Sequence, residues 1–245
     1  TEAPTGAVGG AIVNRVLVLY GADSFGAPAT PRSLIVRWSD RFDFNEWTPS
    51  DVNISGELPL DGGGSRIVGG GLTGFGQCVW TDKRLALLTE TGDINSVFAR
   101  RYIAGSGGLM ANLSWCEVDG RVWYFDDARN LRVYDGGTPR TISNPIRLGT
   151  IERLSDREVA RAYMVANPEF EEILLWYPVG NSDVPNACVV YNYGDDSWHF
   201  WSHERGAYAG RLGVIRSLGA DGQGNLWQHD LDVSLPSPWL LGTPK

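Results

Sequence analysis

The chain has 245 residues, of which 42% are hydrophobic, 31 are glycine and 10 are tryptophan. This hydrophobic share excludes an intrinsically disordered chain, and the glycines lack the three-residue period of collagen. The formal charge of −8 offers no general basic face for phosphates, so the composition does not predict a protein that grips nucleic acid.

The first strand signals are two aliphatic segments near the beginning of the chain. We expect strands over residues 12–20 (IVNRVLVLY) and 34–38 (LIVRW), and Asn14-Arg15 would give a further turn at the start. Residues 26–31 between them contain two prolines, which cannot donate to a strand ladder, so we expect a loop there.

A strand–turn–strand unit then recurs along the chain. The predicted hairpins cover residues 76–89, 113–125, 163–177 and 214–229, with turns at Asp82-Lys83, Asp119-Gly120, Pro168-Glu169 and Asp221–Gly224. A further strand is expected after the first three, over residues 97–103, 131–134 and 187–193. Asp-Gly between apolar runs is a strong hairpin signal.

The hairpins repeat at roughly 40 to 50 residues, which is typical of propeller blades. Helix signals are weak, with one short turn expected after Ser155. We therefore predict an all-β, β-propeller-like fold of roughly four to six blades of short antiparallel strands. It would form a single domain over residues 1–245, and we expect this chain to be part of a longer protein.

Histidine and cysteine give no metal or nucleophile pattern. His199 and His203 lie four apart in a segment that is typical of a strand, which would separate them by about 13 Å, too far to share one metal. Cys78, Cys116 and Cys188 form no Cys-x-x-Cys pair, so we expect buried reduced thiols. We predict neither a metal nor a cofactor.

Paired carboxylates are the remaining candidates for catalysis. Asp126-Asp127, Glu171-Glu172 and Asp195-Asp196 all lie in turn-like contexts, where we expect them to be solvated. Residues 221–227 (DGQGNLW) come nearest to the Ser-x-Asp-x-Gly-x-x-Trp box of propeller sialidases, and we interpret them as a plain hairpin turn. We predict no catalytic residue and no enzyme.

Glycine runs and tryptophans also have structural interpretations. Gly62–Gly64 and Gly69–Gly71 lead into no helix or Lys-Ser/Thr pair, so we expect flexible connections between blades rather than phosphate cradles. Tryptophans recur within the hairpins and are expected to pack the blades rather than to stack on sugars or bases; they are Trp115, Trp123, Trp176, Trp198, Trp201 and Trp227.

Four stretches carry a likeness to a known family. They are residues 35–49 (IVRWSDRFDFNEWTP), 85–108, 123–146 (WYFDDARNLRVYDGGTPRTISNPI) and 189–202 (VVYNYGDDSWHFWS). On these, the chain resembles the β-propeller proteins that form the tail nozzle of short-tailed bacteriophages, often called packaged-DNA stabilisation proteins. The motifs are short, and the chain is shorter than a complete member, so its termini or an insertion domain would be missing.

The resemblance implies a structural virion protein in the phage tail, assembled in the host cytoplasm. It implies a homo-oligomeric ring, six subunits around the DNA exit channel, that contacts portal or adaptor proteins and other tail proteins. DNA would pass through its lumen without specific binding. No apolar run reaches the ~20 residues of a membrane span. Two alternatives stay open: a carbohydrate- or receptor-binding propeller, and a glycoside hydrolase with two carboxylates about 5 to 9 Å apart.

Overall fold

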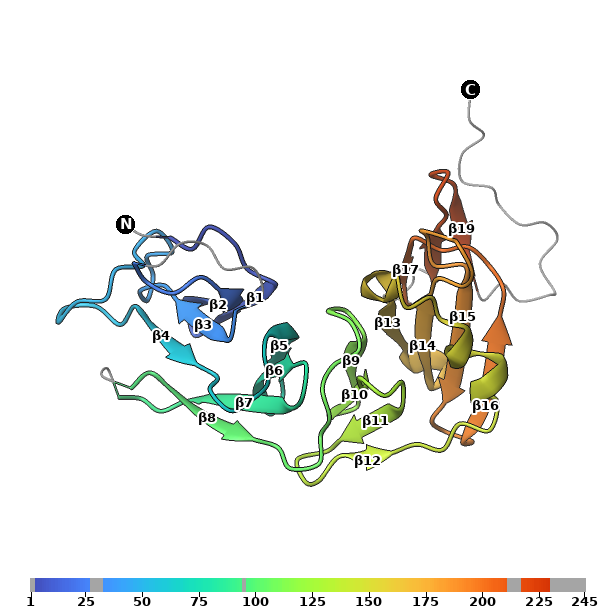
Figure 1. Cartoon of the computed structure of the whole chain (residues 1–245), viewed down its shortest axis with the longest axis horizontal. Helices are drawn as coiled ribbons and strands as arrows, with labels where there is room; N and C mark the ends of the chain where they lie inside the picture. Colours follow the sequence, from blue (N-terminus) through green and yellow to red (C-terminus); the bar gives the residue numbers. More distant parts are fainter. Residues whose placement is uncertain (1–2, 27–32, 94–95, 211–216, 230–245) are drawn as a thin grey trace. The chain divides into compact units, whose positions relative to one another are not determined.

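The computed structural model describes residues 3–26, 33–93, 96–210 and 217–229. Within these ranges, 19 strands form five antiparallel sheets that follow one another along the chain (Figure 1). Four sheets have four strands and the last has three, and strands that are neighbours in the chain are neighbours in the sheet. This is the up-and-down order of propeller blades, so the fold is all-β and β-propeller-like, as predicted.

Two compact units divide the chain. One consists of Thr1–Asn112 with Gly120–Ile142, and the other of Leu113–Asp119 with Ser143–Lys245. The single domain over residues 1–245 stays a prediction. None of the helices in the described part of the chain is long and apolar enough to cross a bilayer.

The first sheet corrects one prediction. Its strands are β1 (Gly9–Val13), β2 (Val16–Ala22), β3 (Ile35–Trp38) and β4 (Gly56–Pro59). Residues 12–20 are not one strand, because the chain reverses at Asn14 and Arg15, whose φ angles are 47° and 67°. Two consecutive left-handed residues form the turn that matches the twist of a hairpin. The predicted Asn14-Arg15 turn is therefore confirmed. The expected loop over residues 26–31 lies almost wholly outside the described residues.

The second sheet places one glycine run differently from the prediction. Its strands are β5 (Ile67–Thr73), β6 (Gly76–Thr81), β7 (Leu85–Glu90) and β8 (Phe98–Tyr102), so the predicted 76–89 hairpin is confirmed. Gly69–Gly71 lie inside β5 and are not a connection between blades. A Cβ on Gly69 would lie 2.5 Å from the Asn112 carbonyl oxygen, and one on Gly70 would lie 2.8 Å from the Cys78 carbonyl oxygen. Glycine is needed here because other backbone approaches closely. The Gly62–Gly64 run does lie between two sheets.

The third sheet confirms the Asp-Gly hairpin signal. Its strands are β9 (Trp115–Val118), β10 (Arg121–Phe125), β11 (Leu131–Tyr134) and β12 (Arg140–Thr141). Asp119 and Gly120 have φ angles of 52° and 68°. Aspartate and glycine tolerate this left-handed region better than most residues, which is why the pair predicts the turn.

The fourth sheet matches its prediction and the fifth extends beyond the described residues. The fourth contains β13 (Tyr163–Asn167), β14 (Glu172–Tyr177), β15 (Ala187–Asn192) and β16 (Ser197–Trp201). The fifth contains β17 (Ala207–Ala209), β18 (Leu218–Ala220) and β19 (Leu226–Gln228). The predicted hairpin at 163–177 is confirmed. Residues 214–216 of the 214–229 hairpin lie outside the described residues, and its remainder is β18 and β19.

Short 3-10 turns are the only helices among the described residues. They are η1 (Arg147–Gly149), η2 (Ile151–Arg153), η3 (Val159–Arg161) and η4 (Pro168–Phe170). The single helical turn expected after Ser155 corresponds to η3. No side chain caps its first turn.

Aromatic side chains fill the core of each unit. In the first unit, Trp38 packs edge-on against Phe98 with ring centroids 5.1 Å apart, within a cluster of buried residues from β2, β3, β6 and β7. In the second unit, the buried Trp176 packs with Tyr208 and Cys188. Trp123 and Trp176 are buried, which confirms blade packing for them. Trp115, Trp198 and Trp201 are half-buried, and Trp227 is exposed.

Candidate functional site

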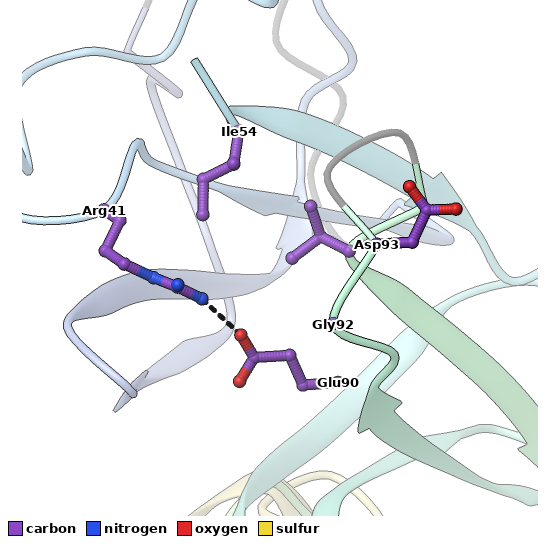
Figure 2. A pocket seen from close by; sticks show the side chains of 6 residues that line it. Arg41, Ile54, Glu90, Gly92 and Asp93 are labelled. Atoms are coloured by element: carbon purple, nitrogen blue, oxygen red, sulfur yellow. Dashed lines mark hydrogen bonds and ion pairs between the residues drawn. The ribbon is translucent and has the colours of Figure 1, made fainter.

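A small pocket lies in the first unit, between the loop that follows β3 and the end of β7 (Figure 2). Its volume is about 110 Å³, and its lining residues are Arg41, Ile54, Glu90, Gly92, Asp93 and Val97. Backbone turns position these side chains, because Arg41 and Ile54 come from the loop between β3 and β4, and Glu90 is the last residue of β7. The pocket therefore presents one positive charge and two negative charges around apolar walls.

Glu90 is the residue that ties the pocket together. Its Oε1 accepts a hydrogen bond from Arg41 in an ion pair (Figure 2), and its Oε2 accepts one from Asn14 Nδ2 at 2.5 Å. The side chain of Arg41 is 43% exposed and that of Glu90 only 19%. Glu90 thus fastens the β1–β2 turn and the loop after β3 to the end of β7. Both of its oxygens are engaged, so it is poorly placed to act as a catalytic base.

A second, wider hollow of about 340 Å³ is also lined by the Arg41–Glu90 pair, together with Asn14, Arg15 and Phe42. The Arg15 guanidinium lies 4.7 Å from the centre of the Phe42 ring, and the Phe42 N–H donates to the Arg15 carbonyl oxygen at 3.0 Å. Phe42 has a φ of 70° and is 66% exposed. A bulky residue in this strained region persists only where its surroundings fix it, and such residues cluster at functional sites. The two hollows offer guanidinium, amide and aromatic groups suited to binding.

Asp126 contradicts the prediction that the acidic pairs are solvated. It is 1% exposed, and its Oδ1 accepts the backbone N–H groups of Ala128 and Asn130 at 3.0 and 2.8 Å. Its Oδ2 accepts from Asn130 Nδ2 at 3.2 Å and from Arg132 Nε at 2.5 Å. The carboxylate is buried because it satisfies the donors of the β10–β11 turn from inside. Asp127, beside it, is exposed as predicted.

Asp221 repeats this arrangement in the β18–β19 turn. Its Oδ1 accepts from the N–H groups of Gln223 and Asn225 at 3.0 and 2.9 Å, and its Oδ2 accepts from Asn225 Nδ2 and Trp227 Nε1, both at 2.9 Å. The bonds from Trp227 and Asn225 lower the pKa of Asp221 to about 2. The interpretation as a hairpin turn is confirmed. Both turns read Asp-x-x-x-Asn-Leu, a repeat that sequence reasoning missed and could have found.

The other acidic pairs belong to turns of the fourth sheet. Glu171 ends η4 in the left-handed conformation, Asp195 Oδ1 accepts the Ser197 N–H at 3.0 Å, and Asp196 Oδ1 accepts the Tyr191 hydroxyl at 2.9 Å. Glu171, Asp195 and Asp196 are exposed, as predicted, whereas Glu172, within β14, is half-buried. Asp195 and Asp196 therefore stabilise the β15–β16 turn.

Histidine and cysteine are not brought together. His199 lies in β16 and His203 beyond its end. Across the residues the structure describes, no three His, Cys, Asp or Glu side chains could hold a metal ion together. Cys78 and Cys188 are buried thiols outside any disulfide, as predicted, and Cys116 is half-buried. Burial raises the pKa of Cys188 well above its usual value.

Comparisons with known proteins give a likeness to solved structures alone. No family model matches the chain, and no curated protein matches it significantly. Among solved structures, the N-terminal domain of Nup159 superposes with a TM-score of 0.47 at 11% identity, over 90% of this chain and 73% of that one.

Proposed function

We propose that this chain is a structural protein of a bacteriophage particle, a subunit of the nozzle ring around the DNA exit channel in a short tail. One observation carries the proposal. Three of the four stretches that resemble the nozzle family contain the third strand of their sheet, namely β3, β7 and β11, and the fourth begins within β15, the third strand of the fourth sheet. The shared position of the stretches in four successive sheets supports the proposal. The resemblance to the nozzle family therefore recurs from sheet to sheet along the chain.

The use of the carboxylates supports a role without catalysis. A glycosidase needs two carboxylates that both reach the substrate. Asp126 is sealed inside a turn by four hydrogen bonds, and Asp221 is held in the same way. Asp195 and Asp196 are bound to Ser197 and Tyr191. Carboxylates committed to turns stiffen blades, as an architectural protein requires.

Labelling in native particles tests the proposal. An epitope tag is fused to the chain in the phage genome, particles are purified, and gold-conjugated antibody is located by electron microscopy. The proposal expects label at one vertex of the capsid, at the tail, in every intact particle. Label absent from particles, or found on the host cell surface, would contradict it.

A glycan-binding propeller is the second candidate, and the exposed Phe42 favours it. Aromatic faces beside Asn and Arg side chains are suited to holding a sugar ring. In this alternative, Phe42 would contact the ring, and Asn14 and Arg41 would contact its hydroxyl groups. A glycan array with the wild-type chain and the Phe42→Ala variant decides it, because a glycan signal lost in the variant is expected only if this hollow binds sugar.

A further inference from the structure

Charge is divided unevenly between the second and the fourth sheet. Residues 66–102, which contain β5–β8, have five basic and three acidic residues, although the whole chain has a charge of −8. Residues 162–204, which contain β13–β16, have seven acidic residues and no lysine or arginine. The net charge of the chain hides this separation.

The positive charge of the second sheet gathers around one aromatic ring. The guanidinium carbons of Arg84 and Arg100 lie 5.1 and 5.9 Å from the centre of the Tyr102 ring. Arg100 and Tyr102 are two residues apart on the edge strand β8 and so share a face. Exposed Lys83 adjoins Arg84 in the β6–β7 turn. We call these four residues the arginine surface.

The two guanidiniums of the arginine surface are exposed to solvent. Among the described residues, neither Arg84 nor Arg100 forms an ion pair, and both are exposed. The nearest acidic residue in the turn, Asp82, accepts hydrogen bonds from Ser65 N–H and Oγ at 2.7 and 2.6 Å. Desolvation by burial raises the pKa of Asp82, but these bonds outweigh it and lower the pKa. The Asp82 carboxylate is therefore engaged by Ser65. Two arginines held against one ring are preorganised for carboxylates.

The negative charge of the fourth sheet gathers at one end. The β13–β14 and β15–β16 turns lie at the same end of the sheet, because Asn167 pairs with Glu172 and Asn192 pairs with both Glu172 and Ser197. We call their exposed acidic residues, together with Asp119, the acidic tip; they are Asp119, Glu169, Glu171, Asp195 and Asp196.

Tyr193 lies within this tip, where burial and the acidic residues around it raise its pKa. Its hydroxyl donates to Asp119 Oδ2 at 3.0 Å, and its N–H donates to the Glu171 carbonyl oxygen at 2.7 Å. Burial, followed by Asp119 and Glu171, raises the pKa of Tyr193 to about 12. The tip is therefore a cluster of negative charge at the end of a sheet whose strands, β13–β16, contain no lysine or arginine.

We infer that the arginine surface binds the acidic tip of a second copy of this chain. A closed ring needs two different, complementary surfaces on each subunit, and these two surfaces match in charge and lie on different sheets. The inference rests on the proposed ring and names its subunit contact. A nucleic acid is less well matched, because a chain of charge −8 would repel its phosphates beyond the patch.

Charge reversal tests the inference in the full-length chain. Sedimentation velocity at low salt measures association of the wild type, of Arg84→Glu/Arg100→Glu, and of Glu169→Lys/Glu171→Lys. Each double variant is expected to associate about tenfold or more weakly than the wild type. An equimolar mixture of the two variants should recover association, because the unaltered acidic tip of the arginine variant then meets the unaltered arginine surface of the glutamate variant. High salt should weaken the wild-type association.

Matched controls separate this contact from general charge effects. Arg140→Glu/Arg157→Glu makes the same charge change at two exposed arginines that belong to neither surface and should leave association unchanged. Far-UV circular dichroism confirms that each variant is folded. A wild-type chain that stays monomeric at every concentration, or a mixture that fails to recover association, overturns the inference. Fluorescent duplex DNA that binds the wild type and not Arg84→Glu/Arg100→Glu also overturns it and assigns the surface to nucleic acid.

The phage experiment distinguishes the two proposals. If particles carrying Arg84→Glu/Arg100→Glu show a normal ring, the contact named here is wrong and the nozzle proposal stands. If the wild-type chain associates as described but is absent from particles, the nozzle proposal fails and the contact stands.

Discussion

The buried carboxylate of Asp126 gives the sharpest test of the reasoning about turns. Asp126→Ala removes the Oδ1 that accepts two backbone N–H groups and the Oδ2 that is the ion partner of Arg132. Removing one partner of a fully buried ion pair costs about 3 to 5 kcal/mol. Arg132 retains 20% exposure and water can reach it, so we expect a loss of about 2 to 4 kcal/mol in the free energy of unfolding.

Asp126→Asn separates the hydrogen bonds from the charge. Its Oδ1 can still accept from Ala128 and Asn130, whereas its amide nitrogen faces the Arg132 Nε donor. We expect it to cost about 1 to 2 kcal/mol, less than the alanine variant. Asp135→Ala is the control, because this exposed turn residue accepts only a long bond of 3.4 Å from the Gly137 N–H. It should change the free energy by less than about 0.5 kcal/mol.

Urea unfolding, followed by tryptophan fluorescence and by circular dichroism, measures these differences. We expect the loss of unfolding free energy to be largest for Asp126→Ala, smaller for Asp126→Asn and smallest for Asp135→Ala. If Asp126→Ala were no more destabilising than Asp135→Ala, the buried carboxylate would not hold the β10–β11 turn and our account of the Asp-x-x-x-Asn-Leu repeat would be refuted.

Two further predictions concern glycine packing and a titrating turn. Gly69→Ala should destabilise the first unit by about 1 to 3 kcal/mol by pressing on Asn112, whereas Gly149→Ala, which has open space, should cost under about 0.5 kcal/mol in the same urea assay. Asp221 should titrate near pH 2 by NMR of its carboxyl carbon, and Trp227→Phe should raise that pKa by removing a donor. Because the pKa is lowered on folding, the stabilisation by Asp221 is present above about pH 4 and is lost as the pH falls towards 2. A pKa unchanged in Trp227→Phe would contradict this.

Hairpins were predicted best where a turn and its strands are local in sequence. Asp119-Gly120 and the strands beside it follow from turn chemistry and from apolar runs. β5 was missed because three glycines weaken the strand signal. Glycine is required there because Asn112, distant in sequence, and the neighbouring strand leave no space for a Cβ. β12 and β17 are two and three residues long, too short to show a period.

The candidate pocket was not predicted because its parts are far apart in sequence. Arg41 and Glu90 are separated by 49 residues, and Asn14 and Glu90 by 76. No local pattern identifies such a pair. The burial of Asp126 could have been predicted, because the Asp-x-x-x-Asn-Leu repeat in two turns indicates a shared structural role for its first residue.

The measurement that tests the central claim most directly is an electron cryomicroscopy reconstruction of the tail vertex of purified particles. The account predicts a ring of six copies around the DNA channel, each with the five successive sheets described here, and with the arginine surface of one copy against the acidic tip of the next. A tail vertex in which no density fits these sheets would contradict the account.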